Sequence, residues 1–320
     1  MIVLTGGAGF IGSCFLAKLN EENITDVLVV DRLGNELKWK NLLGKKFIGF
    51  VHKTKFRENL AKGDYGKEVE AIFHFGACSS TTEKDADYLL DNNFNYSTEL
   101  ADFAAWNDIR FIYASSAATY GMGENGYSDK EFDKLRPLNM YGFSKHLFDL
   151  WVIHHKLDKD FTGLKFFNVF GPNEYHKGDM ASMVLKSYNQ FVQTKKVKLF
   201  KSNTKEFKDG EQKRDFIYVK DAVEIVWKIY KNKKISGIYN LGSGKSRSWN
   251  DLGNAVFRSL RKEPKIEYIE MPDELKSQYQ NYTQADMSRL NKALGKFQFR
   301  TLEDSIDDYV KNYLVKGNYL

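Results

Sequence analysis

The chain has 320 residues, of which 42% are apolar, 15% aromatic and 28% charged. This composition is ordinary for globular proteins, excludes a disordered or fibrous chain, and predicts about two packed units at roughly 150 residues each. The 48 basic and 42 acidic residues leave a net charge of +6, which favours an anionic small ligand but does not indicate nucleic-acid binding.

The N-terminus and the cysteines predict a cytoplasmic protein. Residues 1–5 lack a basic n-region and lead into a glycine-rich turn, which argues against a cleaved signal peptide. No apolar run approaches the roughly 18 residues that cross a bilayer, so we expect no membrane span. Cys14 and Cys78 allow at most one disulfide, and nothing resembles a zinc cluster, so we expect a reducing compartment and no metal site.

Apolar runs alternate with helical segments through the first half of the chain. We expect strands at residues 2–5, 27–31, 71–74, 111–114 and 164–168, and helices at 10–19, 93–106 and 140–156. The runs do not alternate between polar and apolar residues, which is typical of parallel strands covered on both faces. Strands that alternate with helices in this way predict an α/β fold with a doubly wound parallel sheet, the Rossmann fold.

The rhythm changes after Asn168, where longer irregular stretches and a charged segment at 201–213 follow. The run at 214–219 is apolar again, and we interpret it as chain that returns to the sheet. We therefore assign residues 1–167 and a returning segment at about 215–241 to the sheet domain. Residues 168–214 and about 242–320 would form a second, smaller α/β domain that binds the substrate.

The first predicted strand is followed by a glycine-rich turn and a helix. Gly7, Gly9 and Gly12 match the G-x-G-x-x-G pattern, and Gly6 overlaps it with a second regular spacing. Glycine is needed there because the backbone turns tightly, approaches a pyrophosphate and lets the helix pack on the strand. The turn lies directly after a strand and about 20 residues before an acid that ends the next strand, which is the context of a dinucleotide site.

The residues at the end of the second strand indicate which dinucleotide is bound. Asp31 would bond a ribose hydroxyl and so favour NAD. Arg32 follows it and Lys38 lies nearby, and two cations match the 2′-phosphate of NADP. Although either cation could be an ordinary solvated charge, we expect NADP in preference to NAD.

Tyr141 and Lys145 are four residues apart, so they share one face of the helix at 140–156. The pKa of a free tyrosine is about 10, and a lysine ammonium together with a bound nicotinamide would lower it enough for the phenol to act as a base. Ser116 ends the preceding strand and could hydrogen-bond the same substrate hydroxyl. The spacing alone carries little information among 18 tyrosines, but the order of the motifs along the chain supports it.

In this order the motifs resemble the extended short-chain dehydrogenase/reductase superfamily, whose members mostly act on nucleotide sugars. Longer strings at 76–83, 91–93, 167–172, 176–178 and 282–286 are more specific. With the first turn they are similar to the ADP-L-glycero-D-manno-heptose 6-epimerase family, which sets heptose stereochemistry for bacterial lipopolysaccharide core. The resemblance covers essentially the whole chain and departs from the family mainly at an insert at 205–213.

The resemblance implies where the ligands are contacted. Cofactor contacts would fall on Gly6, Gly9, Phe10, Ile11, Gly12, Asp31, Arg32, Lys38, Lys53, Phe75, Gly76, Ala77, Cys78, Ser79, Asn92, Lys145, Val169 and Lys177. Substrate contacts would fall on Ser116, Asn168, Asp179, Lys186, Phe200, Lys201, Ser202, Asn203, Arg214 and Tyr279. The family usually has another residue at Arg32 and a glutamate at Phe75, and the matches at Asp179 and Lys186 are not identical.

The resemblance also implies the chemistry and the assembly. The C6 alcohol of an ADP-heptose would be oxidised and then reduced from its other face, with tightly bound NADP supplying the hydride chemistry. Tyr141 and Lys177 would be the two bases, Ser116 would orient the oxygen, and Lys145 would support Tyr141. From the residues alone, Lys177 could equally grip a diphosphate. The family implies a homo-oligomer, either a pentamer or a pair of pentamers.

Other interpretations remain open. A 4,6-dehydratase would have an Asp-Glu pair directly after Ser116, where this chain has Ala117 and Ala118. A 4-epimerase on another nucleotide sugar shares the tyrosine and lysine chemistry but leaves the string at 78–83 unexplained. A non-catalytic NADP-binding protein should have lost part of the serine, tyrosine and lysine set. A redox role for Cys78 is less consistent with its glycine-rich loop than packing near the nicotinamide.

Overall fold

The computed structural model describes residues 1–35, 37–276 and 279–320. Its largest element is a seven-stranded sheet in the order β10-β6-β5-β4-β1-β2-β3, in which every neighbouring pair is parallel. The strands are β1 (Ile2–Thr5), β2 (Val27–Asp31), β3 (Gly49–His52), β4 (Ala71–His74), β5 (Arg110–Ser116), β6 (Thr162–Phe166) and β10 (Gly237–Leu241). The predicted α/β fold with a parallel sheet is confirmed.

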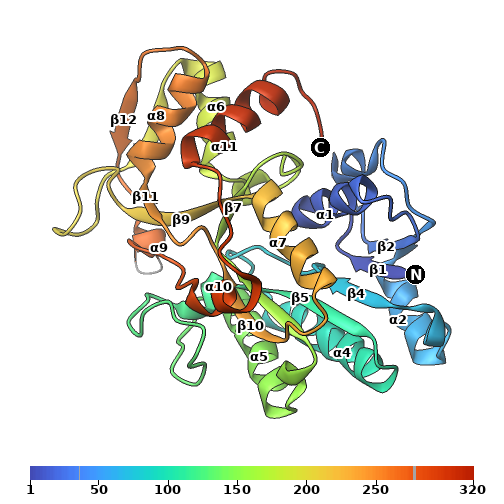
Figure 1. Ribbon diagram of the computed structural model, residues 1–320. Coiled ribbons are helices and arrows are strands. Elements are labelled where there is room, and N and C mark those ends of the chain that lie inside the picture. The colour runs from blue at the N-terminus through green and yellow to red at the C-terminus, as the bar shows by residue number, and fades with distance from the viewer. Residues whose placement is uncertain (36, 277–278) are drawn as a thin grey trace.

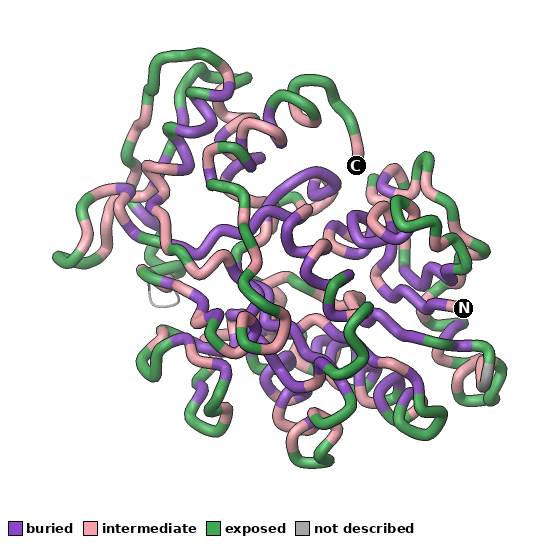
Figure 2. Tube along the Cα trace, in the orientation of Figure 1, coloured by how far each residue is buried: buried purple, intermediate pink, exposed green. Residues whose placement is uncertain are grey.

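Helices cover both faces of this sheet (Figure 1). The helices α1 (Phe10–Glu21) and α7 (Val219–Lys231) pack on one face, and α2 (Lys53–Lys62), α4 (Tyr96–Trp106) and α5 (Met140–His154) pack on the other. Successive strand residues point to opposite faces, so Leu4 joins the core that includes α1 while Val3 joins the core that includes α4. Both faces are therefore apolar, and Figure 2 shows the buried residues concentrated in these layers.

A second, smaller part lies at the upper left of Figure 1. One of its sheets contains β7 (Asn168–Phe170), β9 (Lys213–Tyr218) and β11 (Ser246–Ser248), and the other pairs β8 (Val197–Phe200) with β12 (Ile266–Ile269). Its helices include α6 (Met183–Thr194), α8 (Trp249–Ser259) and α11 (Leu302–Asp308). Three further short helices are α9 (Asp273–Lys276), α10 (Ser288–Leu294) and α3 (Ala86–Leu89), of which α3 packs against α5. α6 packs against α8 through Phe191 and Phe257, whose ring centroids lie 5.6 Å apart, edge to face.

Three predicted elements differ from the structure. The run at 164–168 spans two strands, because the chain leaves the large sheet at Phe167, whose N–H donates to the Leu241 carbonyl at 3.0 Å. The run at 214–219 does not return to the large sheet, since β9 lies between β7 and β11 and the chain rejoins that sheet at β10. Its apolar pattern indicates a buried strand but does not select the sheet that the strand joins. The helix predicted at 93–106 begins within a π-helical turn, Leu90–Asn95, which precedes α4.

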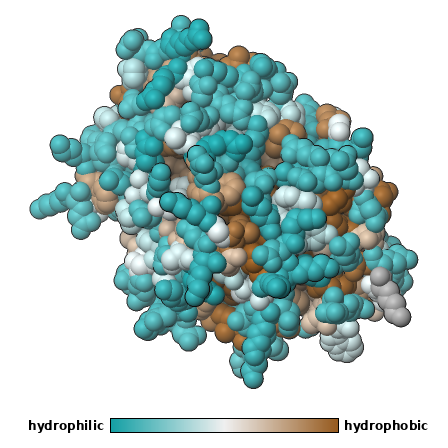
Figure 3. Space-filling model, in the orientation of Figure 1, coloured by the Kyte–Doolittle hydropathy of each residue, from teal (hydrophilic) through white to brown (hydrophobic). Residues whose placement is uncertain are grey.

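The face drawn in Figure 3 is largely hydrophilic, with its hydrophobic atoms gathered near the middle of the view and toward the right. Within the described ranges, no helix combines the length and the apolar character that a membrane crossing requires.

Candidate active site

The order of the large sheet reverses between β1 and β4, and the ends of these strands open into a cavity of about 920 Å³. Doubly wound sheets bind ligands at this point because the loops from the two strands diverge there. All the residues predicted to contact the cofactor line this cavity, as do Ser116 and Tyr141. A larger cavity of about 1200 Å³, lined by parts of β9 and of the chain from 282 to 305, contains none of the predicted site residues.

The glycine turn after β1 forms an open cradle, and side chains larger than that of glycine at these positions would fill it. A Cβ on Gly12 would lie 2.1 Å from the Gly6 carbonyl oxygen, and one on Gly6 would lie 2.6 Å from the Gly76 nitrogen. Gly6 also has a φ of +67°, a left-handed conformation that favours glycine. The Gly9 N–H donates to the Gly6 carbonyl at 2.9 Å and closes the turn in front of α1. The turn thus leaves room for a pyrophosphate at the N-terminus of α1, and these residues fit a dinucleotide.

Asp31, at the end of β2, is engaged by the protein itself. Its carboxylate accepts hydrogen bonds from the Ala8 N–H at 2.9 Å, the Arg32 N–H at 2.6 Å and Lys38 Nζ at 2.8 Å. Burial lowers the pKa of Lys53, and the nearby Arg32 guanidinium lowers it further. Arg32, Lys38 and Lys53 therefore gather positive charge around one carboxylate at this corner of the cavity.

A buried hydrogen-bond chain links the paired strands β1 and β4 to α4. His74 Nδ1 lies 2.7 Å from Thr5 Oγ1, and His74 Nε2 lies 2.8 Å from Ser97 Oγ. Ser97 donates its own proton to the Asn93 carbonyl at 2.6 Å, so the ring must carry its hydrogen on Nε2 and accept from Thr5. Thr5 Oγ1 in turn accepts from the Gly76 N–H at 3.1 Å. Burial lowers the pKa of His74 to about 3. The neutral ring therefore connects the end of β1 to α4, and Thr5 connects it to the loop after β4.

Asn93 clamps the loop after β4 to α5. Its side chain accepts from the Cys78 N–H at 2.8 Å and donates to the Cys78 carbonyl and to Ser144 Oγ, both at 3.0 Å. It belongs to the π-helical turn, a distortion that is frequent at functional sites. The same turn carries Asn92, which lines the cavity. The string at 91–93 includes Asn93, but the sequence patterns assign it no role.

Ser116 ends β5 and Tyr141 is the second residue of α5, and the structure brings these two predicted residues together. Asn139 caps the helix, because its side-chain oxygen accepts from the Gly142 N–H at 2.8 Å. Gly142 allows the close approach, since a Cβ there would lie 2.7 Å from the Ala118 carbonyl oxygen. Burial raises the pKa of Tyr141, and a hydrogen bond with the Ser116 hydroxyl opposes that rise.

Lys145 lies one turn further along α5 and is 4% exposed. Its ammonium donates to the Ala114 carbonyl at 2.9 Å. Burial lowers the pKa of Lys145 to about 8, against the opposing effect of the Asp149 carboxylate one turn later. The side chain is therefore charged below a pH of about 8 and largely neutral above it.

Lys177 reaches the cavity from the loop between β7 and α6. Its Nζ stands over the Phe10 ring, 5.5 Å from the centroid, which places it beside the start of α1. Burial lowers the pKa of Lys177, and the buried Glu174 carboxylate opposes this change. The position suits both roles considered for Lys177, a base and a cation that grips phosphate.

His176 also lines the cavity, and sequence patterns do not assign it a role. Burial lowers its pKa to about 4, and the Lys38 charge contributes to the shift. Its Nδ1 lies 3.4 Å from Asn41 Nδ2, which also donates to the carbonyls of Ala8 at 2.9 Å and Asn173 at 3.0 Å. Asn41 thus ties the glycine turn to the loop that carries His176, and nothing in the sequence signals this contact.

The predicted substrate residues fall into two groups. Those that line the cavity are Ser116, Asn168, Lys186, Phe200 and Tyr279. Those outside its lining are Asp179, Lys201, Ser202, Asn203 and Arg214. Lys201 pairs with Glu270 at 2.6 Å, and the Arg214 guanidinium lies behind the lining, 4.9 Å from the centroid of the Tyr279 ring. The substrate roles of both groups remain predictions.

Proton and hydride transfer need a dinucleotide and a proton acceptor held side by side, so the fold and this cavity define a dinucleotide-dependent enzyme that acts on an alcohol or a ketone. Comparison with known proteins assigns the chain to a more specific class of enzyme. The chain belongs to the NAD dependent epimerase/dehydratase family, whose model matches residues 2–242.

Individual relatives match nearly the whole chain. The protein named ADP-L-glycero-D-manno-heptose-6-epimerase in Nitratidesulfovibrio vulgaris is 49% identical over 320 residues, with 99% of each chain covered. Its namesake in Fusobacterium nucleatum is 49% identical over 327 residues, with 99% of this chain and 98% of the relative covered. The crystal structure of the Helicobacter pylori ADP-L-glycero-D-manno-heptose-6-epimerase matches with a TM-score of 0.82 at 32% identity. The match covers 97% of this chain and 95% of the Helicobacter pylori chain. A UDP-N-acetylglucosamine 4-epimerase from Methanobrevibacter ruminantium, with a TM-score of 0.83 at 24% identity and 98% of each chain covered, shares the fold alone.

Proposed function

We propose that the protein is an epimerase that inverts C6 of the heptose in ADP-glycero-manno-heptose, for the synthesis of lipopolysaccharide core. The observation that carries this proposal is 49% identity, over 99% of both chains, to a protein named ADP-L-glycero-D-manno-heptose-6-epimerase. The site supports it, because a serine and a tyrosine stand beside a dinucleotide cradle in one cavity. Inversion by oxidation and return reduction involves no net redox change, so the cofactor would stay bound between turnovers.

The chemistry divides between the cofactor and the protein. The glycine turn after β1 and the loop after β4 would hold a pyridine nucleotide, which would supply the hydride chemistry at the substrate carbon. The Ser116 hydroxyl would hold the C6 oxygen, and Tyr141 would take the hydroxyl proton from one of the two epimers and would return it when that same epimer is formed. The Lys145 ammonium, charged below a pH of about 8, would favour the phenolate form of Tyr141. Tyr141 needs this help, since burial raises its own pKa.

Lys177 is proposed as the second base, serving the other epimer. A base must be neutral before it accepts a proton, and burial of Lys177 lowers its pKa in the required direction. A role in gripping the diphosphate would instead require the charged form. The two roles therefore predict opposite dependence of turnover on pH.

The proposed cofactor is NADP. Asp31 already accepts three hydrogen bonds from the protein, so its carboxylate has little remaining capacity for a ribose hydroxyl. Arg32, Lys38 and Lys53 leave the corner around it net positive, which suits a 2′-phosphate. The amount of NADP and NAD released when the purified protein is denatured tests this choice.

Three further features belong to the proposal. Residues 1–167 with about 215–241 would bind the cofactor, while 168–214 and about 242–320 would bind the substrate. The protein would be a cytoplasmic homo-oligomer. A 4,6-dehydratase is disfavoured, because the turn after Ser116 begins with Ala117 and Ala118 and supplies no carboxyl group there for water elimination.

The deciding experiment uses the purified chain with ADP-D-glycero-D-manno-heptose and no added cofactor. We expect the C6 configuration, followed by NMR, to equilibrate between the two epimers, and we expect Tyr141→Phe to slow this by a factor of about 100 or more. UDP-glucose serves as the matched substrate control and should remain unchanged. Unchanged heptose in cofactor-loaded protein would refute the proposal, and conversion of UDP-glucose instead would favour a 4-epimerase.

A further inference from the structure

A buried ion pair joins α5 to the large sheet behind the cavity. Lys165 on β6 and Asp149 on α5 are both 0% exposed, and Lys165 Nζ lies 2.5 Å from Asp149 Oδ2. Neither residue lines the cavity, so neither is placed to touch a ligand there. A buried pair loses much of its attraction to the cost of removing two charges from water, so stability alone is a weak reason for it.

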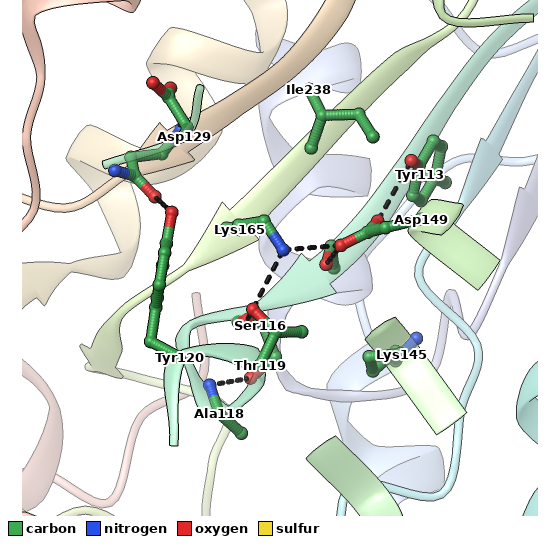
Figure 4. Close-up of polar contacts among 12 residues, drawn as sticks. Tyr113, Ser116, Ala118, Thr119, Tyr120, Asp129, Lys145, Asp149, Lys165 and Ile238 are labelled. Atoms are coloured by element: carbon green, nitrogen blue, oxygen red, sulfur yellow. Dashed lines mark hydrogen bonds and ion pairs between the residues drawn. The ribbon is translucent and has the colours of Figure 1, made fainter. Parts of the chain in front are cut away.

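Both charges are held by further hydrogen bonds. The Asp149 carboxylate accepts from Tyr113 Oη at 3.0 Å and from Ser115 Oγ at 2.6 Å, in addition to Lys165. Lys165 Nζ also donates to Thr119 Oγ1 at 2.8 Å. Figure 4 shows Lys165 between Asp149 on one side and the turn after β5 on the other. The pair therefore connects α5, β5, β6 and the turn after Ser116.

Two paths lead from the pair to the site. The Thr119 hydroxyl donates to the Ser116 carbonyl at 2.9 Å, so Lys165 holds the turn on which Ser116 stands. Asp149 follows Lys145 by one helical turn, and its negative charge opposes the effect of burial on the pKa of Lys145. Lys165 partly neutralises that negative charge from the side of the sheet.

We propose that Asp149 and Lys165 are positioning residues, in which Lys165 fixes Ser116 through Thr119 and Asp149 supplies a negative charge on the helical face of α5 that carries Lys145. Neither touches substrate or cofactor, and both act through the residues that do. The kinetic part of this inference rests on the proposed epimerase function. The geometric part is independent of substrate.

Two substitutions should shift the pH dependence of turnover in opposite directions. Asp149→Asn removes the anion near Lys145, so Lys145 loses its proton more readily and the alkaline limb of the pH–rate profile moves to lower pH. Lys165→Met leaves the Asp149 charge uncompensated, so the limb moves to higher pH. Turnover at its optimum should fall about 10- to 100-fold in Lys165→Met, because Ser116 loses its support. Lys165→Arg keeps the charge and the donors and should restore most of the rate.

Amide hydrogen exchange of the full chain, as purified, tests the geometry without substrate. In Lys165→Met, exchange at residues 116–121 should be about 2- to 10-fold faster, as expected for one lost hydrogen bond, while the rest of the chain changes less. Lys220→Met is the matched control, because Lys220 pairs with Asp308 at 2.7 Å on α7 and α11 and does not line the cavity. It should leave exchange at 116–121 and the alkaline limb unchanged.

The proposal would be overturned if the alkaline limb of the pH–rate profile moved in the same direction in Asp149→Asn and Lys165→Met. It would also be overturned if amide exchange at residues 116–121 were as slow in Lys165→Met as in the wild type. If Lys165→Met does not fold, the double variant Asp149→Asn/Lys165→Met leaves no uncompensated charge and should show the same faster exchange. Absence of turnover in the wild-type protein overturns the proposed function instead, and the exchange experiment then still decides the role of Lys165.

Discussion

Replacing Gly12 by alanine tests whether the cradle after β1 is built around the cofactor. The new methyl group would lie 2.1 Å from the Gly6 carbonyl oxygen and 2.8 Å from the Gly6 carbonyl carbon. Both atoms belong to the backbone, so α1 and the turn must separate by about 1 Å or more to restore ordinary contact. That movement strains the bond from the Gly9 N–H to the Gly6 carbonyl, which is 2.9 Å long.

The expected loss follows from these contacts. Overpacking of this kind costs about 1–3 kcal/mol, and one lost hydrogen bond adds about 0.5–1.5 kcal/mol, so the total is about 1.5–4.5 kcal/mol. In the variant without cofactor, the turn can relax and relieve the clash. Binding a pyrophosphate would require the original turn again, so the free energy of the clash is subtracted from the binding free energy. At about 1.4 kcal/mol for each factor of ten, cofactor affinity should fall about 10- to 1,600-fold.

Two measurements check this result. The nucleotide released on denaturation should be strongly reduced in Gly12→Ala, and added NADP should raise the thermal unfolding midpoint less than in the wild type. Gly66→Ala is the control, because a Cβ on Gly66 meets no atom within 4 Å. Wild-type cofactor content and an unchanged response to NADP in Gly12→Ala would show that the cradle is not the phosphate site.

Further predictions concern the bases, the cofactor and the pH dependence of stability. Tyr141→Phe and Lys177→Met should each slow turnover by a factor of about 100 or more while retaining bound nucleotide, and wild-type rates in both would contradict the two-base scheme. Arg32→Ala should raise the share of NAD among the released nucleotides, and a wild-type protein loaded mainly with NAD would count against NADP. Burial lowers the pKa of His176 from 6.5 to about 4, so the unfolded state binds more protons in this window and wild-type stability falls as pH drops through it. In urea unfolding, His176→Gln should reduce that slope by up to about 1.4 kcal/mol per pH unit, and an unchanged slope would argue against a neutral His176.

Five strands of the large sheet and the cofactor half of the site could be predicted because their signals are local, whereas β3 and β10 were not predicted as strands. The apolar run that ends in Asp31 identifies a strand wherever it lies, and the spacing of Gly9 and Gly12 follows from the backbone of a single turn. Tyr141 and Lys145 share a helical face at any position in a fold. Each of these features depends on a few consecutive residues, so the sequence displays them directly.

The features that were missed depend on distant partners. His74 becomes a structural link only because Thr5 and Ser97 lie on either side of its ring. Asn93 acts through Cys78 and Ser144, and no periodicity brings these three together. The apolar pattern of β9 is the same whichever sheet it joins, so the strand was predicted but its partner was not.

The topology of the outer strand has a consequence for protein synthesis. β10 covers the edge of β6, but the ribosome makes it only after β7, β8 and β9. Until then the growing chain carries an uncovered apolar edge, the kind of surface that pairs with other chains and aggregates. The cofactor-binding sheet therefore cannot finish folding as an independent N-terminal unit. Exchanging one half of this protein for that of a relative at a single junction would separate β6 from the strand that protects it.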